Sequence, residues 1–187
     1  MKKLIIFILF IALCAVSKSQ SNLPYKSLSA FSNDTTAFMI YNFMDRADAY
    51  IDKSIKDVKK DMEISIHHYH YITDSESGII IGMYIYIYGI KRIANSDENN
   101  APEISGLKIY WNKNKSNAED KQIKAIRRKS KYWNKEIEDI LKNFKIREIS
   151  VMIEKKSKYY EKYKPKILKN MNDGSEFSPF IMGDLND

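Results

Sequence analysis

Three histidines, the only ones in the chain, fall within four positions as His67, His68 and His70. Every second residue of a strand faces the same side, so His68 and His70 would lie about 6–7 Å apart on one face. Neutral imidazole is a common ligand of divalent metals, and such a pair can supply two ligands. A catalytic zinc needs a third protein ligand, and no histidine follows downstream to provide it. The pair supports one hypothesis: a metal-binding protein or metal-dependent enzyme that uses His68 and His70.

A second candidate site is a group of tyrosines on the same predicted strands. Tyrosine combines a large, rigid contact area with a polar tip, which suits protein interfaces. Tyrosines also stabilise half-exposed sheets through cross-strand pairs that need no ligand, and the sequence leaves that alternative open. We expect five of them on one face of a β-hairpin: Tyr69, Tyr71, Tyr84, Tyr86 and Tyr88.

The charge is distributed unevenly along the chain. Residues 108–169 carry 20 basic and 8 acidic side chains, whereas residues 21–107 carry 8 basic and 12 acidic ones. A basic face of this kind suits an acidic protein or an anionic component of the cell envelope, although a solvated helix face gives the same pattern. The basic residues we select as binding candidates are Arg127, Arg128 and Lys131.

Patterns typical of enzymes are scarce. The sequence contains no Gly-x-Ser-x-Gly nucleophile turn and no glycine-rich phosphate loop. A carboxylate pair for glycoside hydrolysis needs no fixed spacing, so the sequence leaves that class open. We therefore expect a protein without enzymatic activity and without a cofactor, apart from the divalent metal of the histidine hypothesis.

The first twenty residues have the pattern of a secretory signal peptide. Two lysines precede an apolar run over residues 4–16, and the small residues Ala15 and Ser17 fit a cleavage site after Ser17. The run has 13 residues, whereas a membrane-spanning helix needs about 20. We expect a periplasmic or secreted protein that is not an integral membrane protein. The only cysteine, Cys14, lies in this segment, so the exported protein would be free of disulfides.

Hydrophobic periodicity predicts the elements that position these residues. Apolar residues at helical spacing predict two long amphipathic helices, over residues 34–59 and 118–144, and a basic helix could follow at 155–170. Alternating patterns predict four strands, over residues 62–73, 79–88, 104–111 and 146–153.

The order helix-β-β-β-helix-β predicts an α+β fold, with an antiparallel four-stranded sheet and both long helices packed on one face. We expect a signal peptide at 1–20, one domain at 21–170 and a flexible acidic tail at 171–187.

The predicted function is that of a non-enzymatic binding or protein-interaction module, such as an inhibitor, an immunity-type factor or an envelope component. It would use the tyrosine face, the basic helix or both, and its partner would be another protein or a second copy of itself. Nucleic acid is not an expected partner of an exported protein. The metal hypothesis is the alternative, and it depends on which group lies within about 3 Å of the two imidazoles, since metal–ligand bonds are about 2 Å long.

Overall fold

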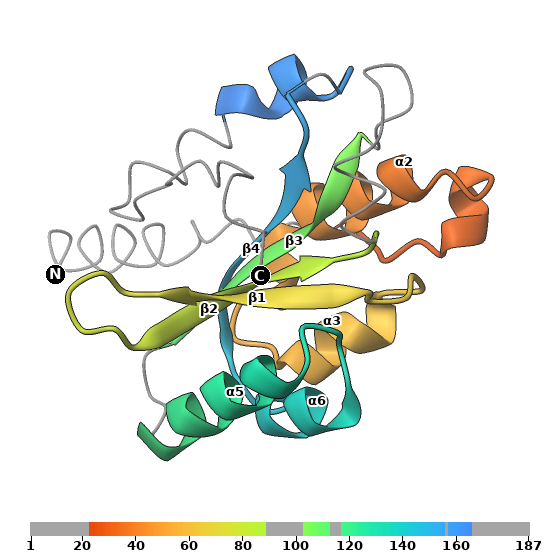
Figure 1. Cartoon of the computed structure of the whole chain (residues 1–187). Helices are drawn as coiled ribbons and strands as arrows, with labels where there is room; N and C mark the ends of the chain where they lie inside the picture. The colour runs from red at the N-terminus through yellow and green to blue at the C-terminus, as the bar shows by residue number, and fades with distance from the viewer. Residues whose placement is uncertain (1–22, 89–102, 113–116, 156, 166–187) are drawn as a thin grey trace, which may run out of the picture.

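The computed structural model describes residues 23–88, 103–112, 117–155 and 157–165. Its centre is one antiparallel sheet in which the strands follow chain order, β1-β2-β3-β4 (Figure 1). The strands are β1 (His68–Thr73), β2 (Ile80–Tyr86), β3 (Ile104–Trp111) and β4 (Ile146–Ile153). The predicted α+β fold with a four-stranded antiparallel sheet is confirmed. The predicted signal peptide at 1–20 and tail at 171–187 lie outside the described residues.

The hairpin between β1 and β2 closes through a turn that the sequence specifies locally. The carboxylate of Asp74 accepts hydrogen bonds from the backbone N–H and the hydroxyl of Ser77, both at 2.9 Å. Gly78 has a φ of 63°, in the left-handed region that favours glycine. These residues reverse the chain and set β1 against β2.

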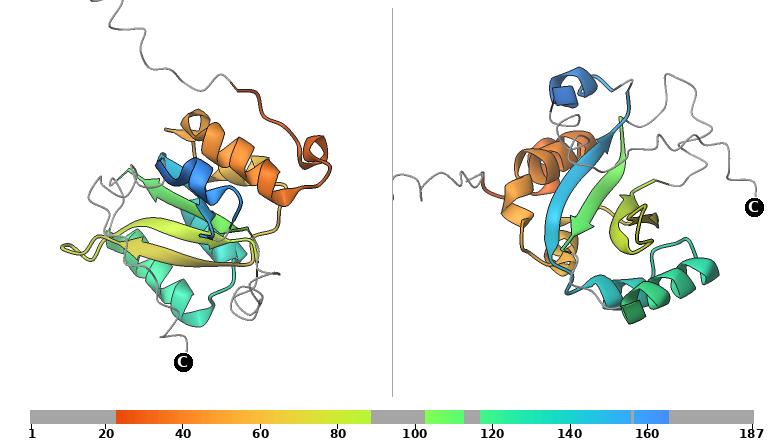
Figure 2. Two further views of the ribbon diagram at one scale, coloured as in Figure 1. Left: turned by 90° about the horizontal axis from the view of Figure 1, so that it is seen from above. Right: turned by 90° about the vertical axis from the view of Figure 1, so that its left-hand side faces the viewer.

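One face of the sheet forms the core. The register aligns its apolar side chains across the strands, and the helices cover them (Figure 2). Phe38 and Phe43 from the first helical region, and Ile123 and Leu141 from the second, are fully buried on this side. The sheet side chains on this face that are at most 3% exposed include Tyr69, Met83, Ile85, Leu107, Ile109, Ile149 and Val151.

The first helical region is not the single helix predicted over residues 34–59. Asp52 takes a φ of 62°, which an α-helix cannot contain, and its N–H bonds to the carbonyl of Ile146 at 2.8 Å. Ser54 then starts a new helix through a capping box with Asp57. The region consists of η1 (Leu28–Phe31), α2 (Thr35–Ile40), the π-helical η2 (Tyr41–Asp45), the 3₁₀-helical η3 (Ala47–Tyr50) and α3 (Ile55–Asp61).

The predicted helix over residues 118–144 is also divided, into α5 (Asn117–Lys129) and α6 (Lys135–Leu141). Between them the chain extends along the outer edge of β1, with an antiparallel bridge between His68 and Tyr132. Of the predicted helix at 155–170, residues 160–165 are helical, and the rest lies outside the described residues. Among the helices that the structure describes, none is both long and apolar enough to traverse a bilayer.

Candidate basic binding site

Helix α5 is held against the β1–β2 hairpin at two points near its beginning. The carboxylate of Asp120 accepts a hydrogen bond from the N–H of Ile80 at 3.1 Å. The ammonium of Lys124 donates to the carbonyl of Gly78, also at 3.1 Å. The apolar side chains Ile123 and Ile126 of α5 face the core, whereas Arg128 and Lys129 are exposed.

The chain after α5 is fixed to the edge of β1. The N–H of Tyr69 donates to the carbonyl of Lys131 at 3.2 Å, and the N–H of Trp133 donates to the carbonyl of His67 at 3.3 Å. The Trp133 ring packs edge-on against Tyr69, with 6.0 Å between ring centroids. Asn134 then caps α6 by accepting a hydrogen bond from the N–H of Ile137 at 3.1 Å. Hydrogen bonds therefore hold this short segment at both ends.

The end of α5 and the segment that follows it form an open, shallow hollow of about 310 Å³. We call it the basic hollow, and its lining residues are Arg127, Arg128, Lys129, Ser130, Lys131 and Tyr132. Tyr132 is 54% exposed, more than any other large hydrophobic side chain in the described part of the chain. Its ring lies 5.7 Å from that of His67.

In the described part of the chain, no carboxylate pairs with the cations of the basic hollow. Ion pairs elsewhere join α3 to α6 through Lys59 and Glu138 or link neighbouring turns of one helix. Within the described residues, no carboxylate lies within 4.0 Å of the four lining cations. The C-terminal end of a helix carries partial negative charge and favours cations. Helix α5 therefore tolerates three basic residues in its last turn.

Arg127 connects the hollow to the predicted histidine site. Its Nη2 lies 3.3 Å from Nδ1 and 3.2 Å from Nε2 of His70, so the guanidinium sits over the imidazole plane rather than at one nitrogen. Its Cζ lies 6.0 Å from the centroid of the Tyr69 ring. Because His70 and Tyr69 point to opposite faces, Arg127 wraps around the edge of β1.

The geometry at His68 and His70 does not resemble a metal site. Their ring centroids lie 6.3 Å apart, whereas two imidazoles on a tetrahedral zinc bring them to about 5 Å, given metal–nitrogen bonds of about 2 Å. The Arg127 guanidinium lies 3.2 Å from Nε2 of His70, and its positive charge would repel a metal cation. Among the described residues, no set of three His, Cys, Asp or Glu side chains could hold a metal ion.

Both histidines are held in the neutral form. Burial is the main cause that lowers the pKa of His68 to about 4, and the neighbouring histidines, Arg127 and Lys131 contribute to the same shift. Burial, followed by Arg127 and Lys131, lowers the pKa of His70 to about 4 as well. Nδ1 of His68 is buried without a hydrogen-bond partner, which adds to the cost of any charge there.

The five tyrosines predicted to share one face do not do so, and that prediction is wrong. Tyr69 lies opposite Ile85 in the register, and Tyr71 lies opposite Met83. Directly paired residues of neighbouring strands project to the same side, so both tyrosines belong to the face that the helices cover. Tyr69 is fully buried there.

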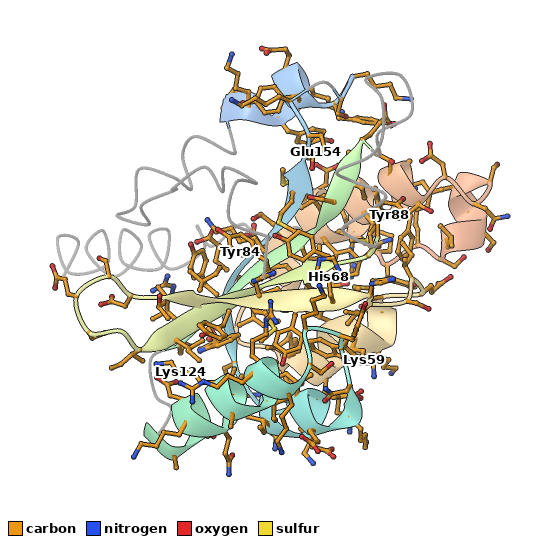
Figure 3. The ribbon with its side chains drawn as sticks, in the orientation of Figure 1. Lys59, His68, Tyr84, Tyr88, Lys124 and Glu154 are labelled. Atoms are coloured by element: carbon orange, nitrogen blue, oxygen red, sulfur yellow. The ribbon has the colours of Figure 1, made fainter. Side chains whose placement is uncertain are left out.

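Tyr84 and Tyr86 lie on the opposite face, together with His68 and His70. Figure 3 labels Tyr84 and His68. Tyr86 stacks on His68 with 4.4 Å between the ring centroids. Burial raises the pKa of Tyr84 to about 12, and two neighbouring tyrosines add to the increase. Tyr88 follows the end of β2 and packs against the core.

Comparison with family models, curated proteins and solved structures finds no match for this chain.

The predicted binding residues Arg127, Arg128 and Lys131 do come together, in the lining of the basic hollow. Sequence reasoning missed Tyr132, the exposed aromatic side chain among them. The available signal was that Tyr132 lies off the apolar stripe, which Trp133 continues. A second signal marks the start of a new helix directly after this segment. Asn134 is a common N-cap residue, and an acidic residue such as Glu136 is favoured in the first turn of a helix.

A separate buried polar network lies at the other end of the molecule. Arg46 is 8% exposed, and it donates to the carbonyl of Leu23 at 2.8 Å and to the Tyr50 hydroxyl at 3.2 Å. Tyr50 in turn donates to Asp61 at 2.9 Å. Burial is the main cause that raises the pKa of Tyr50 above its usual range. These contacts satisfy buried groups and fasten the first described residues, which is a structural role.

Proposed function

We propose that this protein is an exported, non-enzymatic binding protein that contacts a protein partner through the basic hollow. The observation that carries the proposal is the set of four cations that surround an exposed tyrosine without a neutralising carboxylate in the described residues. Arginine and tyrosine are the side chains that most often anchor protein interfaces. Such residues on a fixed backbone lose little conformational freedom when a partner binds.

The lining also argues for binding rather than catalysis at this site. It supplies positive charge, the hydroxyls of Ser130 and Tyr132 and aromatic surface, but neither an imidazole nor a carboxylate that could act as a general base. Export is supported by the lysines, the apolar run and the small residues within residues 1–20. N-terminal sequencing of the protein from its native host is expected to begin between residues 18 and 21.

The test of binding is capture from an envelope extract on immobilised protein that begins at residue 21. The wild-type chain is expected to retain a defined partner, and Arg128→Glu with Lys131→Glu is expected to lose it. Lys60→Glu with Lys155→Glu makes the same change of charge at exposed positions outside the hollow and serves as the matched control. A partner retained by both double variants, or lost from both, would contradict the proposal.

A further inference from the structure

The backbone around the basic hollow is already hydrogen-bonded, which restricts how a partner can bind. The Tyr132 N–H donates to the Ser130 hydroxyl at 3.1 Å, and the Tyr132 carbonyl accepts from the Asn134 amide at 3.4 Å. The backbone groups on the inner side pair with β1. A partner strand that needed these groups would find them occupied, so recognition here depends on side chains.

The cations of the hollow include two guanidinium groups, which prefer carboxylates. Arginine forms two parallel hydrogen bonds to a carboxylate, and the geometry of this fork gives specificity as well as energy. Arg127 is also held in place by the rings of His70 and Tyr69. A guanidinium positioned in advance loses less side-chain freedom on binding than a free one.

The remaining lining favours a polypeptide over a membrane surface. Proteins that lie on membranes usually insert the apolar face of an amphipathic helix. On α5 that face is already used, since Ile123 is fully buried and Ile126 is 8% exposed. Among the six residues that line the hollow, Tyr132 is the one large aromatic side chain, which is enough to contact one side chain of a peptide.

We propose that the basic hollow binds an acidic polypeptide segment, with carboxylates on Arg127 and Arg128 and an apolar side chain against Tyr132. This inference rests on the proposed function and names the chemical class of the partner. The acidic residues supply the charge that the hollow lacks, and the apolar residue covers the most exposed aromatic ring. Lys129 and Lys131 add electrostatic attraction to the acidic segment, which depends less on geometry because the lysine ammonium is a point charge on a flexible side chain.

The probe for this inference is a labelled peptide of eight glutamates around one phenylalanine, compared with a peptide of eight glutamines around one phenylalanine. Fluorescence anisotropy is expected to show binding of the acidic peptide alone, with an affinity that falls as salt is added. Arg127→Ala with Arg128→Ala, and separately Tyr132→Ala, should each weaken binding roughly tenfold, as loss of an interface anchor does. Lys60→Ala with Lys155→Ala should leave the affinity within about twofold.

Three results would overturn the inference. Equal binding of the glutamine peptide would show that carboxylates are not recognised, and equal loss in the Lys60 and Lys155 control would show that only total charge matters. Binding to vesicles containing one third phosphatidylglycerol, without binding of the acidic peptide, would assign the hollow to lipid.

If the envelope capture succeeds while the acidic peptide fails, the proposed function stands and the acidic-segment inference falls. If both fail, neither survives.

Discussion

Arg127 contributes to two environments at once, because its guanidinium lies over the half-buried His70 ring while the residue also lines the basic hollow. A lysine at this position would keep the charge, but it would lose the planar stacking and the forked hydrogen bonds. This dual contact also keeps His70 neutral, since a proton on the imidazole would lie close to a fixed positive charge. Arg127 therefore both lowers the pKa of His70 on the sheet and supplies positive charge to the surface hollow.

The two kinds of tyrosine should respond differently to truncation. Tyr69→Ala removes a ring that is fully buried and packs on Trp133, so we expect a loss of about 3–5 kcal/mol in the free energy of unfolding. Tyr132→Ala removes a ring that is 54% exposed and should change it by about 0.5 kcal/mol or less. Urea denaturation with an unchanged m value measures both. A larger loss for Tyr132 than for Tyr69 would contradict the burial described here.

The side to which each tyrosine points depends on strand register, which sequence alone did not reveal. In the β1–β2 hairpin, odd-numbered residues pair with odd-numbered ones from Tyr69 to Tyr71, and a register shift between Ile72 and Thr73 changes this near the turn. A register displaced by one residue would have put all five tyrosines together. The alternating patterns predicted four strands, although β1 begins at His68 rather than at residue 62 and β2 is shorter than the predicted 79–88. A pattern within one strand does not fix its alignment with the next.

At the scale of elements, both long helices were predicted from apolar spacing, and both are interrupted by residues that prefer a different conformation. Asp52 adopts a positive φ, and Asn134 caps a new helix in the middle of the predicted one. Apolar spacing continues across each break because the segments on both sides pack on the same sheet face. Helix caps are local signals, and Ser54 followed by Asp57 resembles the pattern of a capping box closely enough to be found from sequence.

Asn134 offers a test of how firmly the segment between α5 and α6 is held. Its carbonyl oxygen caps α6, and its amide donates to the Tyr132 carbonyl. Asn134→Ala loses both contacts and should destabilise the fold by about 1 kcal/mol in urea denaturation. Asn134→Asp keeps a cap and adds a favourable charge at the start of α6, so it should restore most of that loss. Equal destabilisation by both variants would show that the cap is not the source of the stability.

At the scale of the whole molecule, the charge asymmetry read from the sequence corresponds to a localised feature of the surface. The excess of basic residues over 108–169 places four cations together where α5 ends. The sequence predicted three of the four cations of the site by charge alone, but it could not predict which cations would lack a nearby carboxylate among the described residues. That depends on tertiary contacts, such as those that pair Lys59 of α3 with Glu138 of α6.

The neutral histidines make the stability of the whole protein sensitive to acid. The pKa of His68 and that of His70 are both lowered from 6.5 to about 4 in the folded protein. Between these pH values the unfolded chain binds more protons than the folded one, so stability is complete above about pH 6.5 and falls as the pH decreases toward 4. A shift of one pKa unit corresponds to about 1.4 kcal/mol. The contribution of each histidine to the free energy of unfolding therefore has an upper limit of about 3 kcal/mol.

Carboxylates also titrate in this range, so the test compares variants rather than one protein at two pH values. His68→Phe with His70→Phe keeps two aromatic rings on the sheet and removes their titration. Urea denaturation at pH 7.0 and pH 4.5 is expected to show a smaller loss of stability in this double variant than in the wild type. His67→Phe, at an exposed position, is the control and should lose as much stability as the wild type. If the double variant loses as much stability as the wild type on acidification, the two buried imidazoles do not remain neutral in the folded protein.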